Sequence, residues 1–392
     1  MHEVLENISR SAKVMTDESV PSDKLGRLTD TMASTLKDTG LVRLLQPVEH
    51  GGYEAHPCDF LEAVMNVGIA APSAGWVSGV VGVHPWEIAM MDPRLQEEIW
   101  GEDPDTWTAS PYAPFGRATR VDGGFLFTGQ WPYSTGTDHS EWVILGGFVL
   151  NEDGEVAGNG GPPDMRHFVI PRADYEIVED SWNVMGLQGT GSKDVRMTDV
   201  FVPEHRVVEA MKMVEGVYED RQAGKPLYRV KFPIMFSAAI AAGTQGIAQG
   251  ALAVYHDYMT TRVSVAGNVA KNDAAHLVIY GEAAADVAAS RSHLLNSMRE
   301  LYDHVSRGGD VSYDQRLVFR RDQVRASRRA ADAIDRIYKI SGASGIRADF
   351  PNERYWRDLQ VGLSHVCNVA ENIYAAWGAH DLGGEAAPAL YV

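Results

Sequence analysis

The sequence predicts an α+β protein in which two helical regions flank a β domain, and three observations along its 392 residues support this order. Apolar residues recur at roughly helical spacing before about residue 105, and they do so again after Pro233. Short runs rich in β-forming residues, separated by turn residues, fill the segment between them. We expect an N-terminal helical domain at 1–105, a central antiparallel β domain at 106–212 and a C-terminal helical bundle at 213–392.

The N-terminal region shows two kinds of helical pattern. Apolar positions at roughly helical spacing are Leu25, Leu28, Met32, Leu36 and Leu41, and Gly40 supplies a stop. The stretch LEAVMNVGIAAPSAGWVSGVVGVHPW is rich in small apolar residues. This composition is typical of two helices in close contact.

The central region consists of short β-rich runs, namely FLFTGQW, WVILGGFVL, RHFVIP and VRMTDVFVP. Turn residues interrupt them at Gly123-Gly124 and at NEDG, residues 151–154. After this region the pattern becomes helical again, with Val324, Ala331 and Ile334 on one helix face.

One segment has the length of a membrane span, because Phe236 to Tyr255 runs without a charged residue. Its content is mostly Ala and Gly with several polar residues, so its transfer into lipid would be weak. We expect a helix packed on several sides by other helices.

Charge and cysteine content exclude several function classes. The chain has 35 Lys and Arg against 53 Asp and Glu, a formal net charge of −18. A polyanion repels phosphate backbones and anionic headgroups, so we expect no nucleic-acid partner and no membrane partner. The two cysteines, Cys58 and Cys367, lie far apart, and no basic-then-apolar leader pattern opens the chain. The expectation is a reduced, cytoplasmic protein.

Common nucleotide and metal motifs are absent from the sequence. It contains no GxxxxGK[ST], no HExxH and no strand-linked GxGxxG, and its thirteen histidines show no metal-ligand spacing. We therefore expect no metal. The run GLQGTGSKDV precedes a β-run rather than a helix, so it predicts a strand-connecting loop whose amides could contact a flat ring or a phosphate.

A basic stretch from Gln315 to Lys339 reverses the overall acidity. It holds eight basic residues against three acidic ones, and Arg321, Arg325 and Arg328 share one helix face. Such a stretch is either a solvated, ion-paired face or an anchor for a cofactor phosphate, since forked guanidinium donors fit phosphate oxygens.

The run WPYSTGTDHSEW places Ser134 and Thr135 after a β-run, beside Trp131 and Tyr133. This pattern is compatible with a packed strand end. It is equally compatible with aromatics and a hydroxyl that face a flat ring.

Two histidines are candidate catalysts. His365 follows a helical segment that contains Arg357, and His84 lies in VGVHPW. Each is either a satisfied core residue or a general base, since an unperturbed imidazole pKa of about 6.5 suits proton transfer near neutral pH.

Seven of these pieces occur in an order that resembles a known family. They are LLQPVEHGGYE, GWVSGVVGVHPW, SPYAP, GQWPYSTGTDHSEW, GLQGTGSKDVRMTDVFVP, RRDQVRASRRAADAIDRIYKISGASGI and RYWRDLQVGLSHV. Together they resemble the acyl-CoA dehydrogenase fold, and more narrowly its branch of two-component, reduced-flavin-using monooxygenases. Within that branch the sequence is most similar to hydroxylases of secosteroid phenols, and less so to those of 4-hydroxyphenylacetate.

The resemblance implies a C-terminal four-helix bundle and a homotetramer built as a dimer of dimers. It implies that a separate NAD(P)H-flavin reductase supplies FMNH2 or FADH2, which reacts with O2 to a C4a-hydroperoxide. The implied reaction is hydroxylation of a phenolic or polycyclic aromatic substrate, ortho to the phenol. Water must be excluded, because a solvated hydroperoxide loses peroxide before it reacts.

The resemblance also assigns roles to residues. For catalysis it implies His365 as the base, His84 as a partner of the phenolic oxygen and Ser134 as a donor near flavin N5. Substrate contacts fall to Ser110, Trp76 and Tyr112. The flavin ring would be bordered by Trp131, Thr135, Gly189 and Thr190, and its phosphate by Arg262, with Arg321 and Arg325 as weaker candidates.

Three alternatives remain open at this stage. The first is an acyl-CoA dehydrogenase, but the position of its common glutamate base is Val366 here, and valine cannot take a proton. The second is an N- or S-oxygenase of the same fold. The third is a scaffold that binds no flavin. Because Pro132 and Tyr133 depart from the steroid enzyme, the substrate need not be a steroid.

Overall fold

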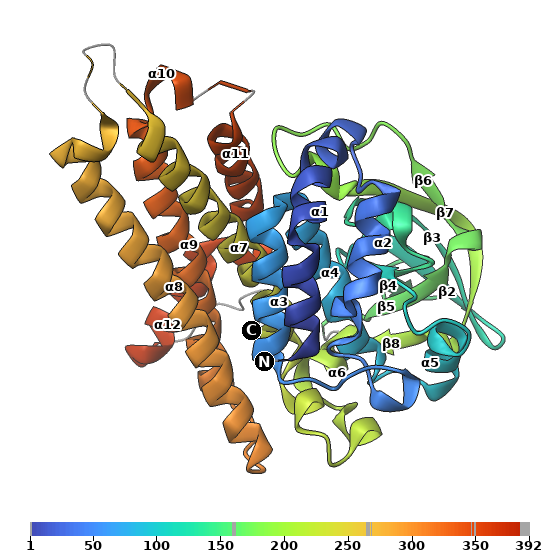
Figure 1. Cartoon of the computed structure of the whole chain (residues 1–392). Helices are drawn as coiled ribbons and strands as arrows, with labels where there is room; N and C mark the ends of the chain where they lie inside the picture. The colour runs from blue at the N-terminus through green and yellow to red at the C-terminus, as the bar shows by residue number, and fades with distance from the viewer. Residues whose placement is uncertain are drawn as a thin grey trace.

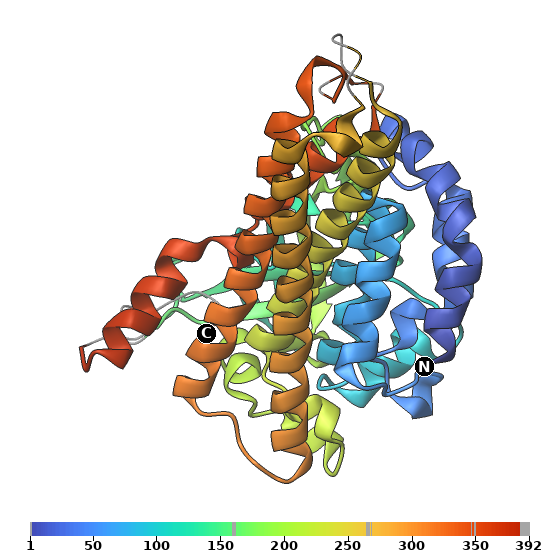
Figure 2. The same ribbon diagram turned by 60° about the vertical axis from the view of Figure 1, so that its left-hand side comes forward.

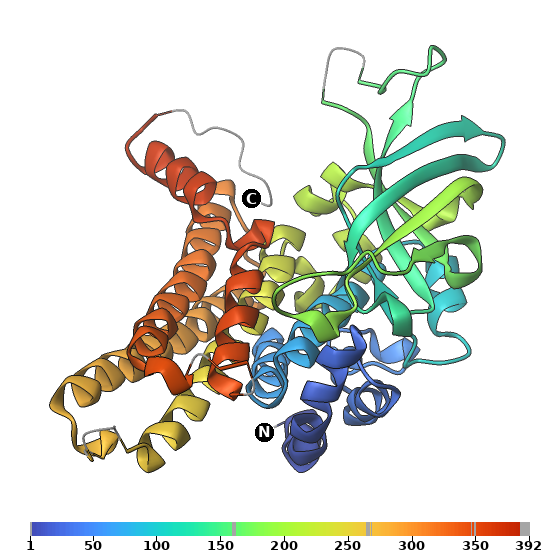
Figure 3. The same ribbon diagram turned by 90° about the horizontal axis from the view of Figure 1, so that it is seen from above.

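The computed structural model describes residues 2–158, 162–263, 267, 269–345, 347–348 and 350–384. The chain forms helices, then a sheet, then helices again (Figure 1). Seen from above, the sheet and the long C-terminal helices lie on opposite sides of the molecule (Figure 3).

Five helices form the N-terminal region, and each begins and ends where the local sequence dictates. They are α1 (Glu3–Leu25), α2 (Asp30–Thr39), α3 (Pro57–Ala70), α4 (Pro72–Ile88) and α5 (Pro93–Trp100). Thr29 caps α2 by accepting from the amide of Met32, and Gly40 ends it with a left-handed φ of +79°. Small residues let α3 and α4 touch: a Cβ on Gly75 would lie 2.4 Å from the Cα of Gly68.

The strands form one sheet that lies within residues 106–212. They are β1 (Thr108–Ala109), β2 (Gly116–Val121), β3 (Gly124–Ser134), β4 (Trp142–Leu150), β5 (Met165–Pro171), β6 (Glu176–Val178), β7 (Lys193–Pro203) and β8 (Val207–Glu209). The order is β6-β7-β3-β2-β4-β5-β8, with β1 beside β4.

The sheet is mixed, which differs from the antiparallel domain expected from the sequence. β1 and β2 both pair parallel to β4, and the remaining pairs are antiparallel. The tight turn at Gly123 makes β2 and β3 a hairpin, but the chain then returns to the far side of β2 and runs in the same direction. A non-local pairing of this kind leaves no signal in the strand sequences.

Long helices make up the C-terminal region. They are α7 (Phe232–Thr261), α8 (Ala274–Ser306), α9 (Tyr313–Ile340) and α11 (Pro351–Leu363), with the shorter α6 (Ala210–Glu215), α10 (Gly342–Gly345) and α12 (Ala370–Asp381). In Figure 2, α12 projects away from the long helices as a red arm. It contacts them through a small apolar cluster that includes Val324 and Ile373.

The uncharged segment forms most of α7, which packs against α3, α4, α8, α9 and α11. Residues 232–248 of this helix are all buried, as the sequence predicts. A search of the described helices found none that combines the length and the apolarity needed to cross a bilayer.

Candidate active site

A cluster of aromatic rings joins the N-terminal helices to the C-terminal region. Trp76 of α4 lies edge-on to His365, with ring centroids 5.7 Å apart, and Phe236 of α7 lies 6.1 Å from the same imidazole. Tyr112 meets Phe236 at 5.1 Å and His84 at 5.9 Å. The aromatic candidates for substrate binding and the two candidate histidines therefore lie along one wall of rings. They are Trp76, Tyr112, His84 and His365.

His365 stands at the start of the short turn η10 (Val366–Asn368), directly after α11. Its Nδ1 accepts a hydrogen bond from the amide of Cys367 at 3.2 Å, as an N-cap residue does. Burial, and then the nearby Arg320 guanidinium, lower the pKa of His365 to about 4. The side chain is therefore neutral at pH 7, with its proton on Nε2.

His84 is fully buried on α4 and has the opposite tautomer. Its Nδ1 faces the carbonyl oxygen of Thr108, which can only accept, so this nitrogen carries the proton. Its Nε2 lies 2.7 Å from Ser110 Oγ and accepts from that hydroxyl. Burial lowers the pKa of His84 to about 4, so it too is neutral at pH 7.

A further polar group, which no sequence motif indicates, lies behind Tyr112. It consists of Glu87 and His167. Tyr112 donates its hydroxyl to Glu87 Oε2, and His167 Nδ1 donates to Glu87 Oε1 at 2.6 Å. All three side chains are buried. Because Tyr112 faces His84 and Phe236, the Glu87 carboxylate fixes the orientation of a ring in the candidate substrate wall.

Ser134 ends β3 and meets the glycine-rich loop of residues 186–191, hereafter the 186–191 loop. The Ser134 hydroxyl is buried, and no described group forms a hydrogen bond with it. Thr135 Oγ1 and Thr190 Oγ1 each lie 2.8 Å from Ser192 Oγ, and the Gly136 amide donates to the Thr190 carbonyl at 3.1 Å. The structure therefore brings together the hydroxyl residues and the loop that the sequence associated with a flat ring.

An exposed tyrosine ring and a half-buried tryptophan ring lie beside this loop. Tyr133 is 68% exposed and its ring lies 6.3 Å from that of Trp182. Trp182 donates its indole N–H to the carbonyls of Leu187 and Gln188, at 3.3 and 3.2 Å. Trp182 precedes Gly186 by four residues and belongs to neither motif, so the motifs alone do not point to it.

Trp131 lies elsewhere than expected. It is fully buried in the core of the sheet, packed against Phe127 at 5.1 Å, and its indole N–H donates to the Gly146 carbonyl at 2.7 Å. Alternation along β3 points Trp131 to the inner face, so it supports the strand and does not border the 186–191 loop in this structure.

The three arginines proposed to bind the flavin phosphate do not lie together within one copy of the chain. Arg262 ends α7 at the tip of the bundle, 3.4 Å from the Ile340 carbonyl, with its guanidinium over Tyr258. Arg321 pairs with Asp322 and lies over Trp377 in a groove on α9 and α12 that Arg325 also lines. No described contact joins any of the three arginines to the 186–191 loop.

Several other arginines of α9 have structural partners, in agreement with the ion-paired alternative. Arg316 forms a double hydrogen bond with Glu215 at 3.2 and 3.1 Å. Arg320 donates to the carbonyl of Cys367 at 2.9 Å, and Arg328 donates to that of Asn368 at 3.1 Å. These last two bonds hold the η10 turn and thereby the backbone that caps His365.

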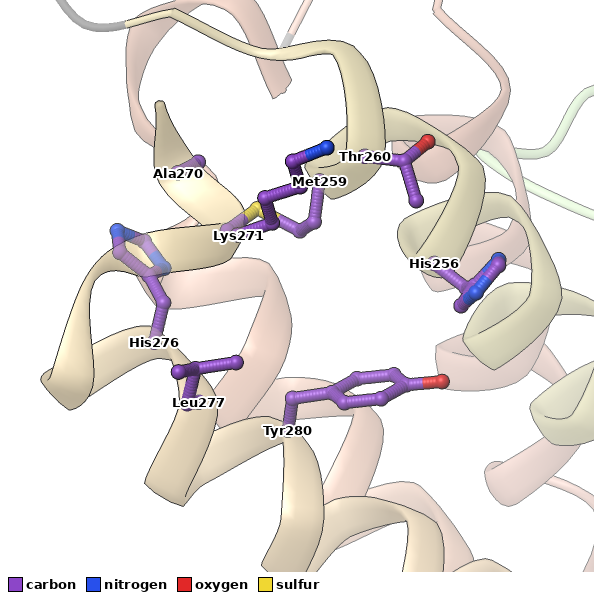
Figure 4. Close-up of a pocket in the computed structure, with 8 residues that line it drawn as sticks. All are labelled: His256, Met259, Thr260, Ala270, Lys271, His276, Leu277 and Tyr280. Atoms are coloured by element: carbon purple, nitrogen blue, oxygen red, sulfur yellow. The ribbon is translucent and has the colours of Figure 1, made fainter. Parts of the chain in front are cut away.

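A separate pocket of about 170 Å³ lies near the same end of the bundle as Arg262. Figure 4 shows its lining side chains, which come from the end of α7, the turn Ala270–Asn272 and the start of α8. Lys271 and His276 are among them, and none of its lining residues belongs to the aromatic cluster.

Fold and site together define a class of protein. Residues 238–369 match the family model described as acyl-CoA dehydrogenase, C-terminal domain. A pigment production hydroxylase from Rhodococcus erythropolis is 43% identical over 386 residues, which covers 98% of this chain and 97% of the relative. The oxygenase subunit HsaA of a flavin-dependent monooxygenase from Mycobacterium tuberculosis is 38% identical over 388 residues, covering 97% and 95%.

A solved structure agrees with these relatives. The crystal structure of 3-HSA hydroxylase from Rhodococcus sp. RHA1 superposes with a TM-score of 0.93 at 36% identity, covering 100% of this chain and 99% of that one. The chain belongs to the flavin-dependent monooxygenases that have the acyl-CoA dehydrogenase fold. It is an oxygenase of the aromatic hydroxylase class, and the expected fold, family and enzyme class are confirmed.

Proposed function

We propose that this protein hydroxylates a phenol, using O2 and a reduced flavin that a separate NAD(P)H-flavin reductase delivers. The observation that carries the proposal is the pair of neutral histidines with opposite tautomers at two ends of one aromatic wall. Flat apolar rings suit an aromatic substrate, and two fixed polar ends suit its hydroxyl group. The names of the relatives, which include a 3-HSA hydroxylase, support the same substrate class.

In this proposal the Ser110–His84 pair accepts the proton of the substrate hydroxyl. Ser110 donates its proton to His84 Nε2, so the lone pairs of Ser110 Oγ are free to accept from a substrate hydroxyl. A phenolic proton that reaches Ser110 passes on to His84, and the ring gains electron density at the carbon ortho to the oxygen.

His365 donates a hydrogen bond to the substrate oxygen in this proposal. While Cys367 donates to Nδ1, the neutral imidazole presents Nε2–H, which hydrogen-bonds a phenolate oxygen and stabilises it. The base role that the family resemblance implies for His365 would require the turn to give up this capping bond. We therefore propose His365 as the group that holds the deprotonated oxygen.

The residues at the 186–191 loop fit a flavin ring. A buried hydroxyl without a partner, as at Ser134, costs about 1–3 kcal/mol, and an acceptor on a ring nitrogen would remove that cost. Thr135, Gly189 and Thr190 would border the ring, with Tyr133 and Trp182 as aromatic neighbours. The bound reduced flavin supplies the activated oxygen; the chain supplies positioning and excludes water.

The assembly and the location are further parts of the proposal. We propose a homotetramer in which Arg262 of one copy contacts the flavin phosphate of another, since no described contact brings it to the loop of its own chain. Exposed Val263, Leu277 and Val278 near Arg262 support an interface there. A cytoplasmic location is supported by two free, buried cysteines.

An acyl-CoA dehydrogenase function is less well supported. Val366 begins η10 with its side chain 43% exposed, and it has no group that takes a proton. The polar groups nearest to it on the chain are His365 and Cys367, neither of which is a carboxylate.

The test is a screen of phenols with the protein, a general flavin reductase, NADH and either FMN or FAD. Mass spectrometry under ¹⁸O2 should show a product heavier by one labelled oxygen for at least one phenol. Reduction of protein-bound oxidised flavin by acyl-CoA thioesters, without oxygen incorporation into any phenol, would contradict the proposal.

A further inference from the structure

The 186–191 loop has a backbone that needs outside support. Leu187 has a left-handed φ of +53° although it has a side chain, and Gly191 has a φ of +54°. A non-glycine residue in this region costs about 1–2 kcal/mol, so other contacts must over-determine the conformation.

A buried carboxylate, Asp358, and a largely buried one, Asp23, supply that support from two distant parts of the chain. Asp358 Oδ1 of α11 accepts from the Leu187 amide at 2.6 Å, and Asp23 Oδ1 of α1 accepts from the Gly189 amide at 3.0 Å. Hydrogen bonds from amides to carboxylates are about twice as strong as those between neutral groups.

The loop is in direct contact with both helices. A Cβ on Gly189 would lie 2.8 Å from Asp23 Oδ1, and a Cβ on Gly186 would lie 2.6 Å from the Arg357 carbonyl oxygen. Both glycines are therefore required for the approach, whatever their φ angles.

Arg354 joins α11, the helix that carries Asp358, to Asp23. This residue of α11 donates to Asp23 Oδ2 at 3.1 Å and to Ser19 Oγ at 2.6 Å, one helical turn before Asp358. Ser73 of α4 also donates to Asp23 Oδ1, at 2.8 Å. Asp23 therefore has its donors in place, whereas no described group forms a hydrogen bond with Asp358 Oδ2.

The other side of the loop meets the candidate flavin segment through Thr190, Ser192 and Thr135. A displacement of residues 187–190 would therefore also displace Thr135 and its neighbour Ser134. A buried carboxylate such as Asp358 is costly, and such groups concentrate where a site must be held in place.

We propose that Asp23 and Asp358 are positioning residues that latch the 186–191 loop in the conformation that receives the flavin ring. This inference rests on the proposed function, because it assumes that the loop borders the flavin. The latch itself is a property of the protein without flavin and can be measured there.

The first measurement is amide hydrogen exchange of residues 187–190 in flavin-free protein. Asp358→Leu removes the acceptor at similar volume and should speed exchange of this segment at least tenfold. Asp358→Asn keeps an acceptor oxygen and should restore most of the protection. Unchanged exchange in Asp358→Leu would overturn the latch.

The second measurement is anaerobic titration with reduced FMN. Asp358→Leu should raise the dissociation constant about tenfold, and Asp358→Asn should lie near wild type. Asp335→Leu is the matched control, because Asp335 accepts from Trp356 of α11 at 3.3 Å without touching the loop. Equal weakening by the control would overturn the assignment to the loop.

The outcomes separate this inference from the proposed function. Wild-type protein that bound reduced FMN while Asp358→Leu bound it equally well would overturn the positioning role alone. Failure of the wild-type protein to bind any reduced flavin would overturn the proposed function, and the positioning role with it. Asp23→Leu provides an independent variant, because it removes the acceptor of the Gly189 amide, and faster exchange at Gly189 is its expected result.

Discussion

At the scale of single residues, the two candidate histidines differ in what they can do because their backbone partners differ. A carbonyl fixes the proton of His84 on Nδ1, whereas an amide fixes that of His365 on Nε2. Sequence alone marks both as candidate bases. The direction of a hydrogen bond depends on a backbone group brought in by folding, so the distinction could not be predicted.

Ser110→Ala should separate proton acceptance by the Ser110–His84 pair from flavin binding. Removal of the hydroxyl leaves His84 without a path to the substrate, so we expect product formation to fall about a hundredfold. The dissociation constant for reduced FMN should stay within twofold of wild type, as measured by anaerobic titration. Ser78→Ala, a buried serine of α4, serves as the control. Full activity of Ser110→Ala would contradict the relay.

The two neutral histidines, His84 buried and His365 half-buried, also predict a stability that falls in acid. Their folded pKa values lie near 4, below the unfolded value of about 6.5, so the unfolded state binds more protons between these limits. Stability should therefore fall as the pH drops from about 6.5 to 4, with roughly 3 kcal/mol from His84 alone. Chemical denaturation of wild type and His84→Gln at pH 7 and 4.5 measures this, and the variant should show a smaller difference between the two pH values.

At the scale of elements, the arginines of α9 show a basic stretch that the sequence reveals, while the partners of its side chains come only from the fold. The basic stretch is visible in the sequence, but its phosphate interpretation competes with a structural one. Arg320 and Arg328 hold the η10 turn through two backbone carbonyls. Those partners lie 47 and 40 residues further along the chain, and nothing in the local pattern reveals them.

Arg320→Leu should destabilise the protein, because it loosens the η10 turn that His365 caps. The change leaves the carbonyl of Cys367 and the side chain of Gln323 without this donor, which costs about 2–4 kcal/mol for two buried acceptors. Lys339→Leu is the control, because its side chain is 70% exposed on the same helix. Urea denaturation should show the loss only in Arg320→Leu, and equal midpoints would refute it.

Asp358, which binds the 186–191 loop, should make stability fall as the pH rises, opposite to the effect of the two histidines. Burial, then the charge of Asp23, raise the pKa of Asp358 to about 7, although Leu187, Arg354 and Arg357 oppose the shift. The folded state thus binds a proton that the unfolded state lacks between about pH 4 and 7, and the cost of the buried charge grows as the pH rises. Asp358→Asn should raise the melting temperature at pH 8 and leave it nearly unchanged at pH 5. A lower melting temperature at pH 8 would contradict this account.

At the scale of the whole molecule, the order of the three regions could be predicted because each has its own composition. Ala- and Gly-rich helices, β-rich runs and an amphipathic basic helix leave local signals. The parallel pairing of β2 with β4 and the meeting of Asp23 with the 186–191 loop are non-local. Such contacts depend on the complete fold, and for the same reason the burial of Trp131 in the core of the sheet could not be predicted.

The assembly gives the remaining prediction. Val278 is 61% exposed on α8 beside Leu277, in a protein whose charge of −18 otherwise favours separation of its copies. If this surface joins copies, Val278→Asp should shift the mass found by light scattering from tetramer toward smaller species. Glu300→Lys, also exposed on α8, should leave the mass unchanged. A wild-type monomer would contradict the proposed tetramer.

The position of the two latching carboxylates has a consequence for the newly made chain. The ribosome releases Asp23 before the 186–191 loop, and it releases Asp358 after that loop. The loop therefore gains its second anchor only after α11 has emerged and docked. A nascent or truncated chain would have the β domain but an incomplete flavin site. The 186–191 loop would thus reach the conformation proposed to receive the flavin only after α11 has docked.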